Sequence, residues 1–168
     1  ADWFNNNIAD LTIDTGSNNP GAIGLRYYSN NVGSARRLEA RSADGRGAIG
    51  LDLGYADQNG PCLAQEIDIR GFAVGVSTGA TVNSQTLETI RVRGATRTGF
   101  ENRGQCLALR RLDIESAGPG FDSRFGVVAL VDSVFRCTAT QPDQAAIRSG
   151  EALFARDLAI TGYRTAID

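Results

Sequence analysis

The sequence predicts an all-β protein, a single-stranded right-handed parallel β-helix of about seven coils with uncapped ends. Two recurring phrases predict this fold. The first phrase is apolar, two polar or charged residues, apolar, one polar residue, apolar, as in residues 64–69 and 109–114. The second phrase is apolar-Gly-apolar, as in Ile49-Gly50-Leu51. A unit that repeats every ~20–50 residues is typical of a solenoid.

The first phrase occurs seven times, and each copy predicts one strand. Its last three residues alternate apolar, polar and apolar, as a strand with one buried face requires. The fourth position of each copy is an anchor for the core, occupied in order by Leu11, Leu38, Ile67, Ile90, Leu112, Ser133 and Leu158. A small residue follows each anchor after four positions and permits a tight corner, for example Ser42 or Gly71.

The second phrase predicts a shorter strand in each coil. Its glycines are Gly24, Gly50, Gly75, Gly99 and Gly126, and the last two coils carry the variants Ala146-Ile147 and Ala166-Ile167. The two phrases keep pace along the chain, so they belong to one coil. Stacking the coils places each strand ~4.8 Å from its counterpart in the next coil.

A helical or leucine-rich solenoid is the rival interpretation. No coil contains a ten-residue stretch with apolar residues at helical spacing, and 20 glycines would be costly in helices. The first apolar position of the repeat is often Ala, and the small residue after it is rarely Asn, which departs from the leucine-rich pattern. The parallel β-helix is therefore the better interpretation.

The composition is that of one domain, residues 1–168, which we expect to be excised from a longer chain because neither end shows a cap. Uncapped coils predict end-to-end self-association. A net charge of −2 argues against nucleic acid as a partner, and no apolar run is long enough to span a membrane. The chain lacks His, which excludes a Ser-His-Asp triad and His-based metal sites. No metal and no cofactor are expected.

The three cysteines are interpreted as small, buried packing residues. Cys62 and Cys106 are expected at similar places two coils apart, ~9.6 Å along the stack, too far for a disulfide. Cys137 is expected at a corner. Asn residues recur ahead of the coils, among them Asn31, Asn59 and Asn102, and we interpret them as turn residues that can bond along the stack.

The polar positions of the first phrase form columns when the coils stack. One column contains Asp68 and Asp113, and its neighbour contains Arg41, Arg70 and Arg93. Such columns suit an exposed sheet that is held in register by cross-strand ion pairs. The alternative is an arginine-lined groove for an acidic polysaccharide, because Arg pairs bidentately with carboxylates.

Carboxylates outside these columns are the candidates for acid–base chemistry, and hydrolysis of a glycosidic bond needs two of them. They are Asp44, Asp52, Asp57, Glu88 and Glu101. Asp52 follows the buried Gly50-Leu51 pair directly, and Glu88 lies in a phrase crowded with polar groups. For each of them, a solvated or turn-capping role is the alternative.

Residues 6–25, 44–54, 58–63, 69–72 and 83–88 resemble bacterial proteins of the pectate lyase superfamily, in the group near the family 55 glycoside hydrolases. The resemblance covers roughly the first 110 residues and implies a right-handed parallel β-helix that acts on or binds extracellular polysaccharide. It carries no catalytic residue over to this chain.

The first functional hypothesis is a fragment of a secreted, extracellular carbohydrate-active enzyme, a hydrolase rather than a lyase, with Asp52 and Glu88 as acid and base. The residues expected to hold its polysaccharide substrate are Arg70, Arg91, Asp57, Asn83 and Gln85. The second hypothesis is a non-catalytic polysaccharide-binding or structural module. Two carboxylates at glycosidase range in an open cleft favour the enzyme, whereas a flat flank of paired charges favours the module.

Overall fold

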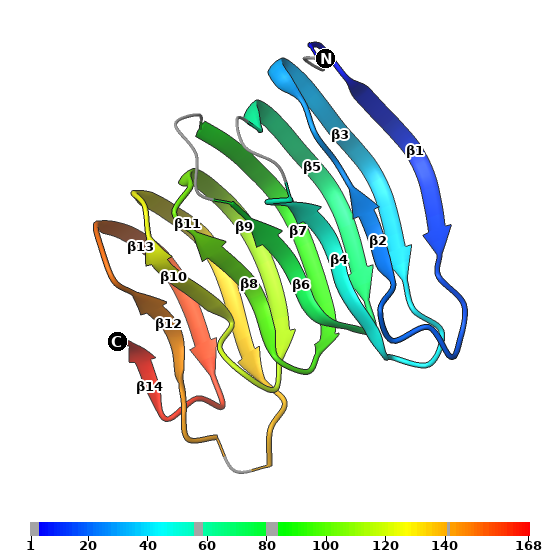
Figure 1. Ribbon diagram of the computed structural model, residues 1–168. Coiled ribbons are helices and arrows are strands. Elements are labelled where there is room, and N and C mark those ends of the chain that lie inside the picture. The colour runs from blue at the N-terminus through cyan, green and yellow to red at the C-terminus, as the bar shows by residue number, and fades with distance from the viewer. Residues whose placement is uncertain (1–3, 56–58, 80–83, 141) are drawn as a thin grey trace.

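The computed structural model describes residues 4–55, 59–79, 84–140 and 142–168 (Figure 1). These residues form β-strands, turns and loops, with no helix among them. Within the same ranges, nothing helical is long and apolar enough to cross a membrane. The all-β class expected from the sequence is confirmed.

Fourteen strands form two seven-stranded parallel sheets that face each other (Figure 1). The odd sheet contains, in order, β1 (Asn7–Asp14), β3 (Asn30–Arg41), β5 (Gly60–Arg70), β7 (Ser84–Ala95), β9 (Cys106–Ser116), β11 (Val128–Cys137) and β13 (Leu153–Thr161). The even sheet contains β2 (Ile23–Arg26), β4 (Gly47–Leu53), β6 (Phe72–Thr78), β8 (Thr98–Arg103), β10 (Phe121–Phe125), β12 (Ala145–Ser149) and β14 (Thr165–Ile167). The chain alternates between the sheets and winds as a parallel β-helix of about six turns, close to the seven coils expected.

The anchors of the first phrase pair with one another in register along the odd sheet. Leu38, Ile67, Ile90 and Leu112 are at most 4% exposed and belong to one continuous core between the sheets. Leu11 is 44% exposed because β1 is an edge strand with a neighbour on one side only. The predicted vertical register of the coils is therefore confirmed.

Each odd strand bends at one residue, just before its anchor. The bend residues share a left-handed backbone, with φ between 50° and 58°: Asp10, Arg37, Glu66, Thr89, Arg111, Asp132 and Asp157. A positive φ is uncommon outside glycine. The bend interrupts the alternation of the strand, so the apolar residues on both sides of it, such as Ala64 and Ile67, are buried. This explains the two consecutive polar positions in the first phrase.

The glycines of the second phrase lie where the two sheets approach most closely. A Cβ atom at Gly75 would lie 2.5 Å from Val92 Cγ1, and one at Gly120 would lie 2.5 Å from Phe135 Cδ1. Phe121 pairs with Phe100 and with Ile147, so Gly120 is the glycine of that coil.

The assignment of Gly126 to the glycine column is therefore wrong. Gly126 instead has a φ of 98° and lies in the turn that follows β10. The alanine variants of the last two coils are confirmed, because Ile147 pairs with Ile167.

The interpretation of all three cysteines as buried is wrong for Cys106, which is exposed, while Cys62 is buried and Cys137 is half-buried. Cys62 pairs with Gln85, whereas Cys106 pairs with Ser84. The two thiols are thus one residue out of register. A shift of one residue moves a side chain to the opposite face of a strand.

Buried amides hold the turns between the even and odd sheets. Asn59 Nδ2 donates to the carbonyls of Tyr27 (2.7 Å) and Leu53 (2.8 Å). Asn102 Nδ2 donates to Ser123 Oγ (3.0 Å), and its Oδ1 accepts from Thr78 Oγ1 (2.7 Å). The structural interpretation of these two asparagines is confirmed, although their partners in neighbouring coils are hydroxyls and carbonyls instead of further asparagines.

Candidate functional site

The outer face of the odd sheet has a charged half that contains the bends. Its arginines are ten: Arg36, Arg37, Arg41, Arg70, Arg91, Arg93, Arg110, Arg111, Arg136 and Arg156. Its carboxylates are also ten: Asp10, Asp14, Glu39, Glu66, Asp68, Glu88, Asp113, Glu115, Asp132 and Asp157. The charged half is therefore electrically balanced at neutral pH.

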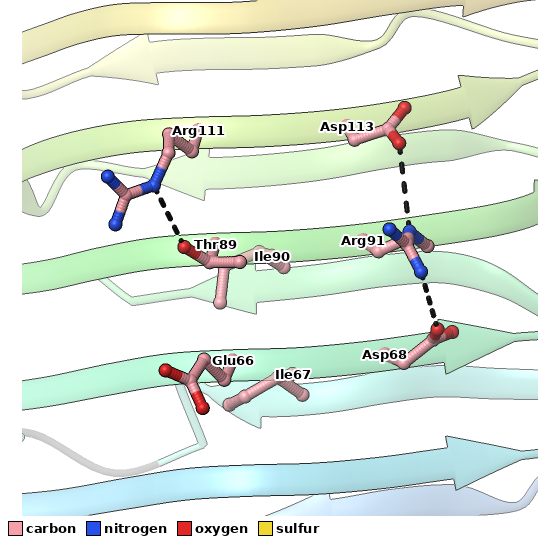
Figure 2. A pocket seen from close by; sticks show the side chains of 8 residues that line it. All are labelled: Glu66, Ile67, Asp68, Thr89, Ile90, Arg91, Arg111 and Asp113. Atoms are coloured by element: carbon pink, nitrogen blue, oxygen red, sulfur yellow. Dashed lines mark hydrogen bonds and ion pairs between the residues drawn. The ribbon is translucent and has the colours of Figure 1, made fainter.

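Ion pairs within a strand and across neighbouring strands link these side chains into a ladder. Arg70 Nε lies 2.9 Å from Asp68 Oδ1, and Arg91 Nη1 lies 3.5 Å from Asp68 Oδ2. On β9, Asp113 accepts from Arg93 Nη2 (2.5 Å) and from Arg136 Nη1 (2.5 Å). Figure 2 shows Arg91 between Asp68 and Asp113, bridging three strands. The predicted ion-pair columns are present.

The arginines keep two of the ladder carboxylates ionised. A hydrogen bond from Arg70 lowers the pKa of Asp68 below its ordinary value of 3.8. Burial acts to raise the pKa of Asp113, but hydrogen bonds from Arg93 and Arg136 outweigh it, so this pKa is also lowered. Asp68 and Asp113 therefore carry no proton at neutral pH and cannot serve as general acids there.

A pocket of ≈ 240 Å³ lies between the bend column and the ladder. Figure 2 shows Glu66, Thr89 and Arg111 along one side and Asp68, Arg91 and Asp113 along the other. The anchors Ile67 and Ile90, which directly follow the bend residues Glu66 and Thr89, also line it. The pocket offers a ligand paired charges and ionised carboxylates, with no proton donor among Asp68 and Asp113.

The other half of the same face contains two columns that have no charged residue. One of these columns lies within the first five residues of its strands: Asn7, Ser34, Leu63, Thr86, Ala108, Ala129 and Phe154. Beside it, two residues earlier in the chain, lie exposed residues: Val32, Pro61, Ser84, Cys106, Val127 and Ala152. Three hollows of ≈ 420, ≈ 320 and ≈ 800 Å³ lie on these columns, and Thr86 lines all of them. The ≈ 800 Å³ hollow is lined by uncharged residues alone, whereas Arg36 also lines the ≈ 420 Å³ hollow, and Glu88 and Arg110 also line the ≈ 320 Å³ hollow. We name this feature the uncharged groove.

The structure places the two predicted catalytic residues on different sheets. Asp52 lies in β4, is 3% exposed, and accepts from Arg26 Nε (3.2 Å) and from the Gly54 amide (3.1 Å). Glu88 lies in β7, where its carboxylate accepts from Gln65 Nε2 (3.0 Å) and is paired with Arg111. Each carboxylate thus has its own structural partners, and their joint catalytic role stays a prediction.

The predicted substrate-binding residues are also distributed. Arg70 and Arg91 belong to the ladder, where both are engaged by Asp68. Gln85 is 1% exposed, and its Nε2 donates to the Asn59 carbonyl (2.8 Å) inside the coil. Asp57 and Asn83 lie outside the described residues. For all of these residues, contact with substrate stays a prediction.

A pair of carboxylates that the sequence did not reveal lies on the even sheet. Glu101 of β8 and Asp122 of β10 are register partners on adjacent strands, and both are half-buried. Each has one distant arginine, Arg97 at 3.6 Å from Glu101 and Arg148 at 3.9 Å from Asp122. The sequence contains a signal for Asp122, because Gly120-Phe121-Asp122 aligns with Gly99-Phe100-Glu101. Assigning Gly126 to the glycine column put this coil out of alignment.

Comparison with known proteins gives no match among family models, curated proteins or solved structures. The class of protein is therefore defined by its architecture. It is a parallel β-helix whose outer odd face is divided into a balanced charged half and an uncharged groove.

Proposed function

We propose that this β-helix is a non-catalytic module that binds a polysaccharide along the outer face of the odd sheet. The observation that carries the proposal is the uncharged groove, which crosses the strands from β3 to β13 beside the ladder. A groove that is open along its length can accept a polymer and leave both ends of that polymer free. The resemblance of the sequence to polysaccharide-active β-helices supports the same proposal, and an extracellular location belongs to the proposal as well.

The ladder supports binding over catalysis. Glycoside hydrolysis needs one carboxyl group that holds a proton and a second that is ionised. Asp68 and Asp113, which line the pocket, both have lowered pKa values, and each forms ion pairs with arginine side chains. Asp52 and Glu88 belong to separate sheets. The ladder is accordingly a scaffold that keeps the coils in register.

Hydrolysis is the second candidate, and the Glu101–Asp122 pair favours it. Adjacent strands lie ~4.8 Å apart, close to the ~5–5.5 Å that separates the carboxyl groups of retaining glycosidases. In this version the even sheet would hold the reacting sugar, and Glu101→Gln would abolish the release of reducing ends. The aligned placement of the two carboxylates supports this candidate.

The two candidates are separated by measuring binding and cleavage on one panel of neutral and uronic polysaccharides. Affinity electrophoresis reports binding, and an assay for reducing ends reports hydrolysis. We expect retardation by at least one polysaccharide without new reducing ends. If the unmodified protein releases reducing ends and Glu101→Gln does not, the protein is a hydrolase and the proposal of a non-catalytic module is wrong. An absence of both signals across the panel would overturn the proposed function.

A further inference from the structure

The walls of the uncharged groove differ in chemistry from every other part of the odd face. None of the thirteen residues in its two columns is charged, whereas the adjacent half carries the full ladder. Its floor is shallow and smooth because Thr86, Ala108 and Ala129, which are register partners on consecutive strands, have short side chains. Val127 and Phe154 project beside it with 57% and 58% of their surface exposed.

The size of the groove selects a slender occupant. Between β3 and β13 it crosses five strand spacings of ~4.8 Å, and its two columns are about 7 Å apart, so its footprint is of the order of 200 Å². A stable protein–protein interface buries about 800 Å² on each partner. A second copy of the chain resting on this groove alone would therefore be held weakly, whereas a linear polymer would cover it completely.

The backbone of the groove offers nothing to a peptide. The strands hydrogen-bond to one another along the axis of the coil, so their amides and carbonyls are already paired. An extended peptide lying across them would leave its own backbone groups unpaired against apolar side chains, which is costly. A pyranose ring instead presents an apolar face to Ala108 or Val127 and directs its hydroxyls to the edges, where Ser84 and Thr86 can bond with them.

The charge of the groove selects among polysaccharides. Arg110, on its ladder side, is already paired with Asp132 at 3.0 Å, and Arg111 is paired with Glu88. Arg36 lines the ≈ 420 Å³ hollow, but the ≈ 800 Å³ hollow beyond it, which reaches from β7 to β13, is lined by uncharged residues alone. A uronic acid chain would have to desolvate a carboxylate on each sugar against an uncharged floor, with Glu88 close to the same hollow as Thr86. We infer that the groove binds a neutral, linear polysaccharide lengthwise, across the strands. This inference rests on the proposed function and narrows it to one face and one class of glycan.

Cys106 provides a direct test because its exposed thiol lines the groove. Cys137, at the end of β11 and away from the groove, is an internal control in the same molecule. Burial raises the pKa of Cys62 to about 12, so this third thiol stays unreactive. The rate at which iodoacetamide alkylates Cys106 and Cys137 is followed by peptide mass spectrometry, with mixed-linkage β-glucan, xylan, mannan or polygalacturonate present.

With a neutral polysaccharide at about ten times its Kd, alkylation of Cys106 should slow roughly tenfold while that of Cys137 is unchanged. Polygalacturonate should protect neither thiol. The inference would be overturned if a neutral polysaccharide binds the protein and the rate of Cys106 alkylation does not change.

A matched pair of substitutions locates the binding face independently. Ala108→Arg puts a long cation on the groove floor, and Ala159→Arg puts the same side chain at another exposed alanine of the odd sheet, outside the groove. We expect the first to weaken binding of the neutral polysaccharide more than about tenfold, which is about 1.4 kcal/mol, and the second to leave it unchanged. Thermal melts of both variants check that the coil is intact.

The outcomes distinguish a failure of this inference from a failure of the proposed function. Binding of uronic chains only, or equal binding by the two alanine variants, overturns the inference and leaves the binding module in place. Binding of no polysaccharide by the unmodified chain overturns both.

Discussion

Asp113 has the largest number of arginine partners among the ladder residues. Its two oxygens accept from Arg93 and Arg136, and Arg91 lies 3.7 Å away. Without the carboxylate, three guanidinium groups on neighbouring strands would face one another with one anion fewer between them. Because its side chain is 30% exposed, solvent screens these interactions only in part.

Replacing Asp113 with Asn should therefore lower the free energy of unfolding by about 1–2 kcal/mol, within the range of hydrogen bonds to charged groups. Urea denaturation measures the change. Asp157→Asn is the matched control, because Asp157 and its partner Arg156 are both more than 60% exposed. It should cost less than about 0.5 kcal/mol. Equal losses in the two variants would contradict a special role for Asp113.

The same carboxylates make stability depend on pH. Asp68 and Asp113 have folded-state pKa values below the 3.8 of the free side chain, so the unfolded chain binds protons more readily than the folded one. Their contribution to stability is present above pH 3.8 and is lost as the pH falls through the lowered values.

Urea midpoints measured from pH 7 down to pH 2 should accordingly stay level at first and then fall below about pH 4. Asp113→Asn should show a shallower fall, since one of the groups responsible is gone. A midpoint that rises on acidification would show that these carboxylates are not stabilised by folding.

The glycine column is the feature that allows the strands of the two sheets to pack closely. At Gly75 a methyl group would meet Val92 at 2.5 Å as well as the carbonyl oxygen of Gly99 on the next coil. Gly99 belongs to the adjacent strand of the same sheet, so a side chain at Gly75 would disturb the pairing of β6 with β8 as well as the contact between the two sheets. The glycine of the second phrase thus lies against an apolar side chain of the first phrase, and this contact requires a residue without a side chain.

Gly75→Ala should lower the free energy of unfolding by about 1–3 kcal/mol, as overpacking of a core does. Gly21→Ala is the control, because a methyl group there meets nothing within 4 Å and the backbone does not require a positive φ. The control should be neutral or slightly stabilising. Chemical denaturation of both variants tests this, and a harmless Gly75→Ala would show that the close approach is not needed.

The strands and anchors could be predicted from the sequence because their period reports burial directly, as at Leu38 and Ile67. The bends could not be predicted, although they explain why each first phrase has two consecutive polar residues before its anchor. The bend position holds Glu66 in one coil, Thr89 in the next and Arg111 in the third, so no shared residue type signals a left-handed backbone.

The parts of the candidate site that depend on register escaped prediction for a related reason. Cys106 was misplaced by one residue, which sufficed to move a thiol from the core to the groove. Asp122 was missed because two glycines six residues apart, Gly120 and Gly126, fit the repeat about equally well. The register of Phe121 with Phe100 and the lack of room beside Phe135 identify Gly120, and both depend on contacts between coils or between sheets.

At the scale of the whole molecule, the net charges of the first four strands of the odd sheet alternate in sign. β1 has a net charge of −2, β3 of +2, β5 of −1 and β7 of +1. Opposite charges on neighbouring strands attract, and like charges directly opposite one another are destabilising. The alternation therefore favours the native order of the first four coils over a slipped stack in which strands of one sign would meet.

This internal balance leads to a prediction about ligand binding by the intact molecule. The ladder neutralises itself and the two columns of the groove carry no charge, so association with a neutral polysaccharide should involve no release of salt ions. Its Kd should change less than about twofold between roughly 0.05 and 0.5 M NaCl, a range over which exposed charge–charge attraction is strongly screened. Titration calorimetry at both salt concentrations measures this. An affinity that falls steeply with salt would indicate that the ligand binds to the arginines of the ladder and not to the groove. The ligand would then be an acidic chain.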